Sequence, residues 1–141
     1  MNRAELIRQS RKLDRKQMTK WLEKETGKKI TSSTFEKIMH ELLPLEQCYQ
    51  NEVIHFIKTI PGAFVWKATA GPYSRQGIPD VCAIIDGHFF GFEIKRPYIG
   101  KATKVQEETI RQINKSGGTA AVISFAEQAK EIIDKWKKTQ T

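Results

Sequence analysis

The chain has 141 residues, of which 39% are apolar, and it carries a net charge of +8 with an isoelectric point near 9.6. This length suits one domain, or a small domain with an appendage, and no apolar run approaches the roughly 18 residues needed to span a bilayer. Two isolated cysteines exclude a disulfide framework and a CxxC zinc site. The N-terminus lacks the apolar centre of a signal peptide, so we expect a cytoplasmic protein with no membrane partner. The positive charge favours a polyanionic partner such as a nucleic acid.

The first part of the chain, residues 1–46, is predicted to be a charged helical extension. Dispersed leucines and a methionine among charged residues predict one helix over 3–25. The sequence STFE is typical of a capping box, so a second helix is expected to begin with Ser33 as its N-cap and to end before Pro44. No helix-turn-helix pattern is recognisable, and we expect this part to make accessory contacts with the nucleic acid or to support a dimer.

The second part, residues 47–141, is predicted to be an α/β domain. Its predicted elements, in chain order, are a helix over 45–60, strands over 63–69, 81–85 and 88–94, a helix over 103–116 that Thr103 and Gln106 cap, a strand over 119–124 and a helix over 126–137. Adjacent strands followed by an α-β crossover predict a mixed sheet flanked by helices. Trp66 and Trp136 are expected in its core.

The hairpin formed by the second and third strands places charged residues together. Asp86-Gly87 is a strong signal for a two-residue turn, so Ile85 is expected to face His88. Counting outward from that pair, Asp80 falls directly opposite Glu93. Lys95 points to the same face, because side chains alternate along a strand.

Two carboxylates at this separation repel each other unless a proton or a cation lies between them. Oxygen ligands suit Mg²⁺ or Mn²⁺, and the backbone carbonyl of Ile94 is a candidate additional ligand. The ammonium of Lys95 could orient or help deprotonate an attacking water, and together these groups suit hydrolysis of a phosphodiester. A surface ion pair is the alternative, but both strands are apolar on both faces, which favours a central hairpin with a functional end.

The spacing of these residues resembles a known signature. GIPD at 77–80, twelve intervening residues and EIK at 93–95 resemble the PD-(D/E)xK nucleases. Together with Gln106 and the helix-borne acid Glu52, the set is similar to the virus-type replication-repair nuclease domain, VRR-NUC. The resemblance covers about Gln47 to Asp134. It implies a restriction-endonuclease-like core of order αβββαβ over 47–141, with the helical extension outside it.

The resemblance also implies roles for these residues. Asp80 and Glu93 would be metal ligands, Lys95 the catalytic lysine, and Gln106 a residue that places Lys95 or the substrate. Glu52 would be a further catalytic acid and a candidate ligand for a second metal. The position of Glu52 is explained equally well if its side chain simply faces solvent. Gln106 is equally explained if its only role is to cap the helix over 103–116.

The implied activity is that of a Mg²⁺- or Mn²⁺-dependent DNA endonuclease. Small members of the family look like homodimeric enzymes that cut four-way (Holliday) junctions in DNA repair, in a phage or in its host. Candidate DNA contacts beside the site are Lys67, Ser74, Arg75, Arg96, Lys101 and Lys104. The alternatives are a non-catalytic DNA-binding or assembly protein on a nuclease scaffold, and a nuclease of the same fold with a restriction or transposon-end substrate.

Overall fold

The computed structural model describes residues 1–69 and 75–140, so the predicted DNA contact Ser74 lies outside the described residues. The chain forms two compact units. The helical unit consists of Met1–Leu45 and Arg96–Gly100, and the sheet unit consists of Glu46–Lys95 and Lys101–Thr141. In the described parts of both units, every helix is too short or too polar to cross a membrane.

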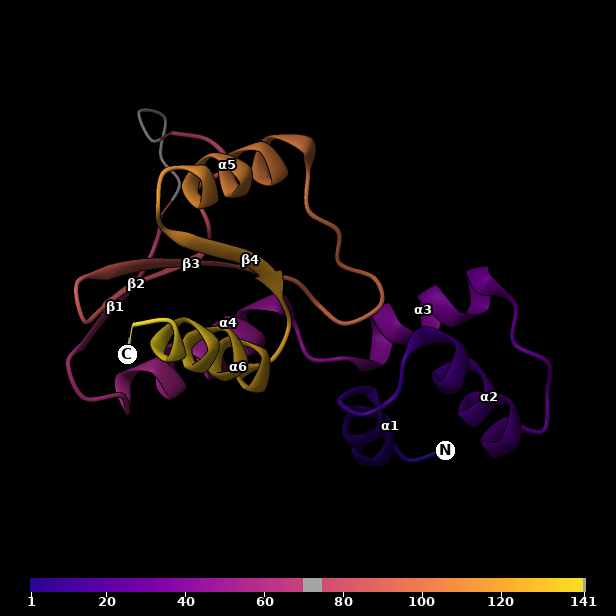
Figure 1. The fold of residues 1–141 in the computed structure, drawn as a ribbon. Helices are drawn as coiled ribbons and strands as arrows, with labels where there is room; N and C mark the ends of the chain where they lie inside the picture. The colour runs from indigo at the N-terminus through magenta and orange to yellow at the C-terminus, as the bar shows by residue number, and fades with distance from the viewer. Residues whose placement is uncertain (70–74, 141) are drawn as a thin grey trace. The chain divides into compact units, whose positions relative to one another are not determined.

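The sheet unit contains a four-stranded mixed sheet with strand order β1-β2-β3-β4 (Figure 1). In chain order its elements are α4 (Glu46–Lys58), β1 (Ala63–Lys67), β2 (Val81–Ile85), β3 (His88–Ile94), α5 (Lys104–Lys115), β4 (Thr119–Ile123) and α6 (Ala126–Lys138). The first three strands pair antiparallel, and β4 pairs parallel to β3. The predicted α/β class and αβββαβ order are therefore confirmed.

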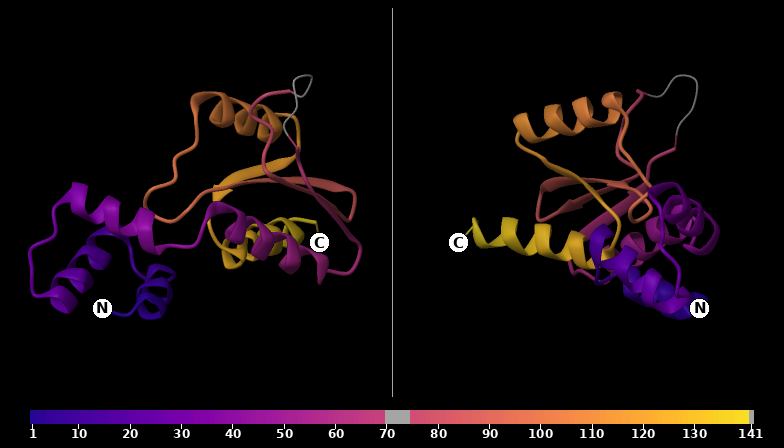
Figure 2. Two further views of the ribbon diagram at one scale, coloured as in Figure 1. Left: turned by 180° about the vertical axis from the view of Figure 1, so that it is seen from behind. Right: turned by 90° about the vertical axis from the view of Figure 1, so that its right-hand side faces the viewer.

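Helices cover both faces of this sheet. The helices α4 and α6 lie on one face and α5 lies on the other (Figures 1 and 2). The core between the sheet and the helices α4 and α6 is largely apolar, with Val53, Ile57, Phe90, Phe92 and Ile133 almost completely buried. Burial of apolar surface on this scale is the main stabilising contribution to a domain of this size.

The two tryptophans of the sheet unit differ in exposure. Trp136 packs against the core and stacks on His88, with ring centroids 4.4 Å apart. Trp66 is 38% exposed on β1, so its predicted place in the core is wrong. It lies on the edge strand β1 and points away from the core under α4 and α6, because the neighbouring Val65 packs against that core.

The predicted hairpin register is confirmed. Asp86 and Gly87 both have positive φ, at 50° and 79°, as a type I′ turn requires. Ile85 pairs with His88 and Val81 pairs with Phe92. One further step along the same register brings Asp80 opposite Glu93 at the end of the hairpin.

The helical unit contains three helices, α1 (Arg3–Ser10), α2 (Arg15–Thr26) and α3 (Ser32–Leu42). The prediction of one helix over 3–25 is wrong, because Asp14 starts a new helix. Its side chain accepts a hydrogen bond from Gln17 N–H at 2.8 Å, and the Gln17 side chain accepts one from Asp14 N–H at 2.9 Å. This reciprocal capping box satisfies two backbone donors and so separates α1 from α2.

The third helix also begins at a different residue from the one predicted. Thr31, and not Ser33, is its N-cap, because the Thr31 hydroxyl accepts a hydrogen bond from Thr34 N–H at 3.2 Å. The predicted end is close to the observed one, since the cap at Leu43 directly precedes Pro44.

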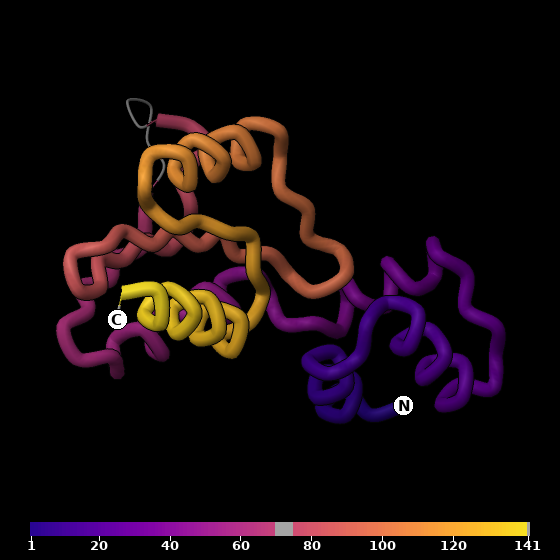
Figure 3. The backbone as a smooth tube through the Cα atoms, viewed as in Figure 1, coloured from indigo at the N-terminus to yellow at the C-terminus, as the bar shows by residue number. Residues whose placement is uncertain are grey.

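A short segment distant in sequence completes the core of the helical unit. The backbone leaves β3, passes through Arg96–Gly100 and continues into α5 (Figure 3). Tyr98 donates a hydrogen bond to the Leu13 carbonyl, and its ring meets Phe35 edge-on with centroids 5.4 Å apart. Arg96 donates to the carbonyl oxygens of Met39, His40, Leu43 and Pro44, at the end of α3.

Candidate active site

The loop before β2 is pressed against α5, and this positions Asp80. Gly77 has φ +82°, and a Cβ atom there would lie 2.7 Å from Thr109 Oγ1 and 2.8 Å from the Val105 carbonyl. Only glycine fits both the backbone conformation and the space. The glycine of the G-x-PD pattern is therefore required in this chain by its backbone conformation and by its close packing against α5.

Asp80 is fixed at the end of the hairpin by backbone groups on both sides. Ile94 N–H donates to Asp80 Oδ2 at 2.9 Å, and Ala68 N–H donates to the Asp80 carbonyl at 2.8 Å. One carboxylate oxygen is thereby held toward β3, beside Glu93.

Glu93 is the most unusual side chain in the sheet unit. It is 1% exposed, and both of its carboxylate oxygens are buried without a hydrogen-bond partner in the described chain. Burial first, and then the nearby Asp80 carboxylate, raise its pKa from 4.5 to about 9, while Lys95 acts in the opposite direction. A buried carboxyl in this setting must hold a proton or meet a cation.

Lys95 lies between two acids. Its Nζ is 3.9 Å from Glu93 Oε2 and 4.0 Å from Glu46 Oε1. Glu46 is the first residue of α4, so this helix brings an acid to the end of β3 from its N-terminal turn. Sequence reasoning missed Glu46, and the available signal was its place directly after Pro44-Leu45, where the helix begins.

Glu52, the acid predicted for the site, makes a different contact. Its Oε2 accepts a hydrogen bond from Ala126 N–H at 2.9 Å. Ala126 is the first residue of α6, and the N-cap residue Phe125 has no side chain that could accept this bond. Glu52 therefore caps α6 and supplies a negative charge at the positive end of its dipole.

A cleft of about 520 Å³ opens beside Asp80. The polar side chains that line it include Thr69, Arg75, Gln76, Asp80, Thr103 and Gln106. Gln106 Oε1 accepts a hydrogen bond from Thr103 N–H at 2.9 Å, which confirms the predicted capping box. Its amide nitrogen has no partner in the described residues, so the capping role leaves a donor free beside this cleft.

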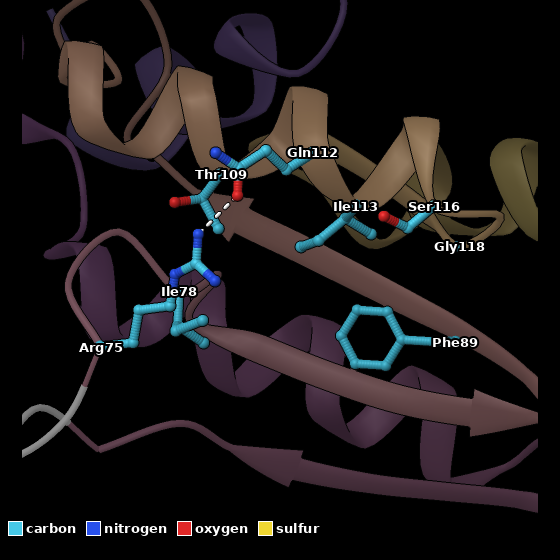
Figure 4. Close-up of a pocket in the computed structure, with 8 residues that line it drawn as sticks. All are labelled: Arg75, Ile78, Phe89, Thr109, Gln112, Ile113, Ser116 and Gly118. Carbon is cyan, nitrogen blue, oxygen red and sulfur yellow. Dashed lines mark hydrogen bonds between the residues drawn. The ribbon is translucent and has the colours of Figure 1, made fainter.

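A second cavity, of about 340 Å³, lies between α5 and β3 (Figure 4). Ile78, Phe89 and Ile113 line it, and Arg75 donates a hydrogen bond across its mouth to Gln112 Oε1. Arg75 also lines the cleft beside Asp80. This exposed guanidinium thus bridges the loop before β2 and α5.

The other predicted DNA contacts lie in varied surroundings. Lys101 and Lys104 are exposed, the latter as the first residue of α5. Lys67 pairs with Val81, whose side chain is in the core under α4 and α6, so strand alternation puts Lys67 on the face opposite Glu93. Arg96 belongs to the helical unit, where its guanidinium is occupied by carbonyl oxygens.

The donor set fits a hard divalent cation. Among the described residues no group of three or more His, Cys, Asp or Glu side chains is arranged to hold a metal. Asp80 and Glu93 nevertheless offer two adjacent carboxylates, and the Glu93 oxygens are buried without hydrogen-bond partners. Mg²⁺ is commonly held by one or two carboxylates, with waters completing its octahedron.

Comparison with solved structures identifies the fold. A structure described as a VRR_NUC domain matches with a TM-score of 0.54 and 22% sequence identity, covering 63% of this chain and 94% of that chain. No model of a known protein family matches the chain. No curated protein matches it either. The sheet, its flanking helices and their order are thus those of a VRR_NUC fold.

Proposed function

We propose that the chain is a divalent-metal-dependent DNA endonuclease whose site consists of Asp80, Glu93, Lys95 and Glu46. The observation that carries the proposal is the buried Glu93 carboxyl, which lies beside Asp80 and Lys95 and has no hydrogen-bond partner in the described chain. A buried carboxyl without a partner lowers the stability of the folded protein, and a role in a metal-dependent reaction explains why the chain contains one. The VRR_NUC fold supports the same assignment.

Asp80 and Glu93 would hold Mg²⁺ or Mn²⁺, with the carbonyl of Ile94 as a further ligand. The bound cation would supply a nucleophilic water at neutral pH and neutralise charge on the phosphate. Lys95 directs its ammonium toward the reacting water or a phosphate oxygen, and Glu46 fixes the orientation of that ammonium. Gln106 and Arg75 donate to phosphate oxygens from the cleft beside Asp80. The reaction adds water across one P–O bond of the backbone and leaves a phosphomonoester and a hydroxyl.

The proposed site differs from the predicted one in one acid and in two DNA contacts. Glu46 takes the place of Glu52 as the helix-borne acid, because Glu46 is the α4 residue near Lys95 and Glu52 caps α6. Lys67 and Arg96 are omitted as DNA contacts. Lys101, Lys104 and Arg75 are retained.

The proposed substrate is branched DNA, cut by a homodimer. An exposed apolar patch on the sheet, formed by Phe64, Trp66 and Ile84, supports self-association. Phe64 pairs directly with Ile84, and the rings of Phe64 and Trp66 lie 5.6 Å apart on the edge strand β1. A two-fold dimer suits a junction that has two equivalent scissile strands.

The test is cleavage of end-labelled DNA by the full chain. A four-way junction, a flap, a splayed arm and a plain duplex are each incubated with Mg²⁺, Mn²⁺ or EDTA. We expect metal-dependent, paired cuts in the junction. Cuts in every substrate would retain the nuclease and remove the junction preference, whereas binding without cleavage in any metal would favour the non-catalytic scaffold.

Two variants connect the activity to the site. Lys95→Ala should abolish cleavage and leave DNA binding nearly unchanged, while Lys115→Ala, an exposed lysine at the far end of α5, should cleave normally. Asp80→Asn should weaken metal binding in a calorimetric titration as well as cleavage. Full activity in Lys95→Ala, or an unchanged metal titration in Asp80→Asn, would contradict the assignment.

A further inference from the structure

The helical unit carries most of the positive charge of the protein. Its 50 residues contain 12 Lys and Arg against 6 Asp and Glu, a net charge of +6. The sheet unit contains 12 against 10, a net charge of +2. The strongest electrostatic attraction for a polyanion is therefore outside the unit that holds the candidate site.

Five lysines of this unit recur at every fourth position through α2 and its flanks. This lysine row consists of Lys12, Lys16, Lys20, Lys24 and Lys28, all of them exposed. Within α2, Lys16, Lys20 and Lys24 lie on one face and are about 6 Å apart along the axis, because residues four apart on a helix are neighbours on its surface. Lys12 and Lys28 flank the helix at its two ends. None of the five amino groups makes a hydrogen bond or ion pair with any described residue.

The helix α6 provides a contrast within the same chain. It contains three acids, Glu127, Glu131 and Asp134, and Lys130 forms an ion pair with Asp134 four residues later. In α2, successive lysines at the same spacing repel each other, which destabilises a helix. A helix that faces only solvent gains no stability from lysines at this spacing, whereas a polyanionic ligand would relieve their repulsion.

The surroundings of the row favour a nucleic acid over a membrane. A helix that binds a lipid surface exposes an apolar face next to its basic residues. The exposed large apolar residues of the helical unit are Met1 and Leu45 alone, and neither belongs to α2. A regular series of cations without apolar neighbours matches the regular charge of a phosphate backbone.

We infer that the helical unit binds the phosphate backbone of DNA through the lysine row of α2. The choice of DNA among nucleic acids rests on the proposed function, but the binding itself needs neither metal nor cleavage. Because the contacts are to phosphates, they give affinity without sequence preference.

The experiment measures the salt dependence of binding by the full chain to a fluorescent DNA duplex in EDTA. Fluorescence anisotropy gives the binding constant between roughly 50 and 200 mM salt, where phosphate contacts dominate. The variant Lys16→Gln/Lys20→Gln/Lys24→Gln should lower the slope of log K against log salt by about 2.7, because each phosphate contact contributes about 0.9. The matched control Lys130→Gln/Lys135→Gln/Lys138→Gln removes the same charge from α6 and should leave the slope unchanged.

Two further measurements keep the inference falsifiable. Lys16→Arg/Lys20→Arg/Lys24→Arg retains the charge and should keep the wild-type slope. Glutamine and lysine have similar helix propensities, so circular dichroism should show all variants folded. Equal slopes in the α2 and α6 glutamine variants would overturn the inference. It would also be overturned if the α2 glutamine variant lost binding to phosphatidylserine vesicles but retained binding to DNA. Because the slope is measured in EDTA, where no metal-dependent cleavage occurs, it tests the lysine row whether or not the protein is a nuclease, and the cleavage assay tests the proposed function separately.

Discussion

At the scale of single residues, two acids of the same helix make different contacts, and we propose different roles for them. Glu46 lies 4.0 Å from Lys95 Nζ, and Glu52 accepts a hydrogen bond from the first backbone N–H of α6. Both are glutamates of α4, six positions apart, and the sequence alone favoured Glu52. The distinction rests on where the first turn and the middle of α4 lie relative to the strands and to α6, which no local pattern encodes.

Substitution should separate these roles. Glu46→Gln should lower kcat/KM roughly 10- to 100-fold, as is usual for residues that orient a metal-site group. Glu52→Gln should cost about 1 kcal/mol of stability through its weaker cap, with kcat/KM unchanged below the melting temperature. Cleavage kinetics and thermal melts of both variants check this, and the reverse pattern would restore Glu52 to the site.

The buried Glu93 predicts an unusual pH dependence in the metal-free protein. Its pKa is about 9 in the folded protein against an ordinary value of 4.5, so between these values the folded state holds a proton that the unfolded state has released. The free energy of unfolding should therefore fall as pH rises across this window, by at most about 1.4 kcal/mol per pH unit. Glu93→Gln should remove this slope and stabilise the protein at neutral pH.

Urea unfolding in EDTA over this pH range provides the measurement. Adding Mg²⁺ should reverse the trend in the wild-type protein, because the cation competes with the proton and binds more tightly as pH rises. A wild-type slope that is identical to the slope of Glu93→Gln would show that Glu93 does not hold the proton.

At the scale of elements, close packing of a loop on a helix holds the site together. Gly77→Ala would place a methyl group within 2.8 Å of atoms of α5 and would force alanine into positive φ. We expect a loss of more than about 2 kcal/mol and weaker metal binding, since Asp80 follows three residues later. Gly117→Ala is the matched control, because φ there is +100° but the space around it is open.

The comparison of these two variants separates the effect of backbone strain at positive φ from the effect of a steric clash with α5. Gly117→Ala should lose only the backbone contribution, about 1 kcal/mol, and should bind metal normally. Thermal melts and metal titrations give both quantities. Equal effects in the two variants would mean that the contact between the loop and α5 does not position Asp80.

Much of the fold was predictable because its signals are local. The Asp86-Gly87 turn fixed the register of the hairpin, and with it the opposition of Asp80 and Glu93. Thr103 and Gln106 correctly marked the start of α5. The same type of signal at Asp14 and Gln17 separates α1 from α2, but an aspartate cap within a long polar stretch was not distinguished from a surface residue.

Other features could not be predicted from local patterns. Trp66 was expected in the core because it lies in an apolar strand, yet that strand is at the edge and one face of it is open. Arg96 was expected to contact a phosphate because it follows Lys95, and no local pattern indicated that its guanidinium donates to carbonyls more than fifty positions earlier in the chain. Such contacts depend on how distant segments meet, and sequence separation gives no information about them.

At the scale of the whole molecule, the exposed patch on β1 predicts self-association. Phe64 and Trp66 are 60% and 38% exposed on an edge strand, which also presents unpaired backbone groups. The variant Phe64→Ser/Trp66→Ser should convert a dimer into a monomer in sedimentation experiments. Val122→Ser, which changes a 42% exposed residue on the opposite edge strand, should remain dimeric. A monomeric wild-type protein would contradict the proposed dimer.

The segment Arg96–Gly100 makes the two units inseparable, because it belongs to the helical unit but lies within the sequence of the sheet unit. The backbone passes from one unit to the other three times, after residues 45, 95 and 100. A gene shortened to begin at residue 46 would leave Tyr98 and Ile99 without the helices that bury them, shortly after Lys95. The helical unit therefore cannot be gained or lost by a simple fusion at one terminus. Any ancestral exchange of this unit would have required a matching change in the connection between β3 and α5.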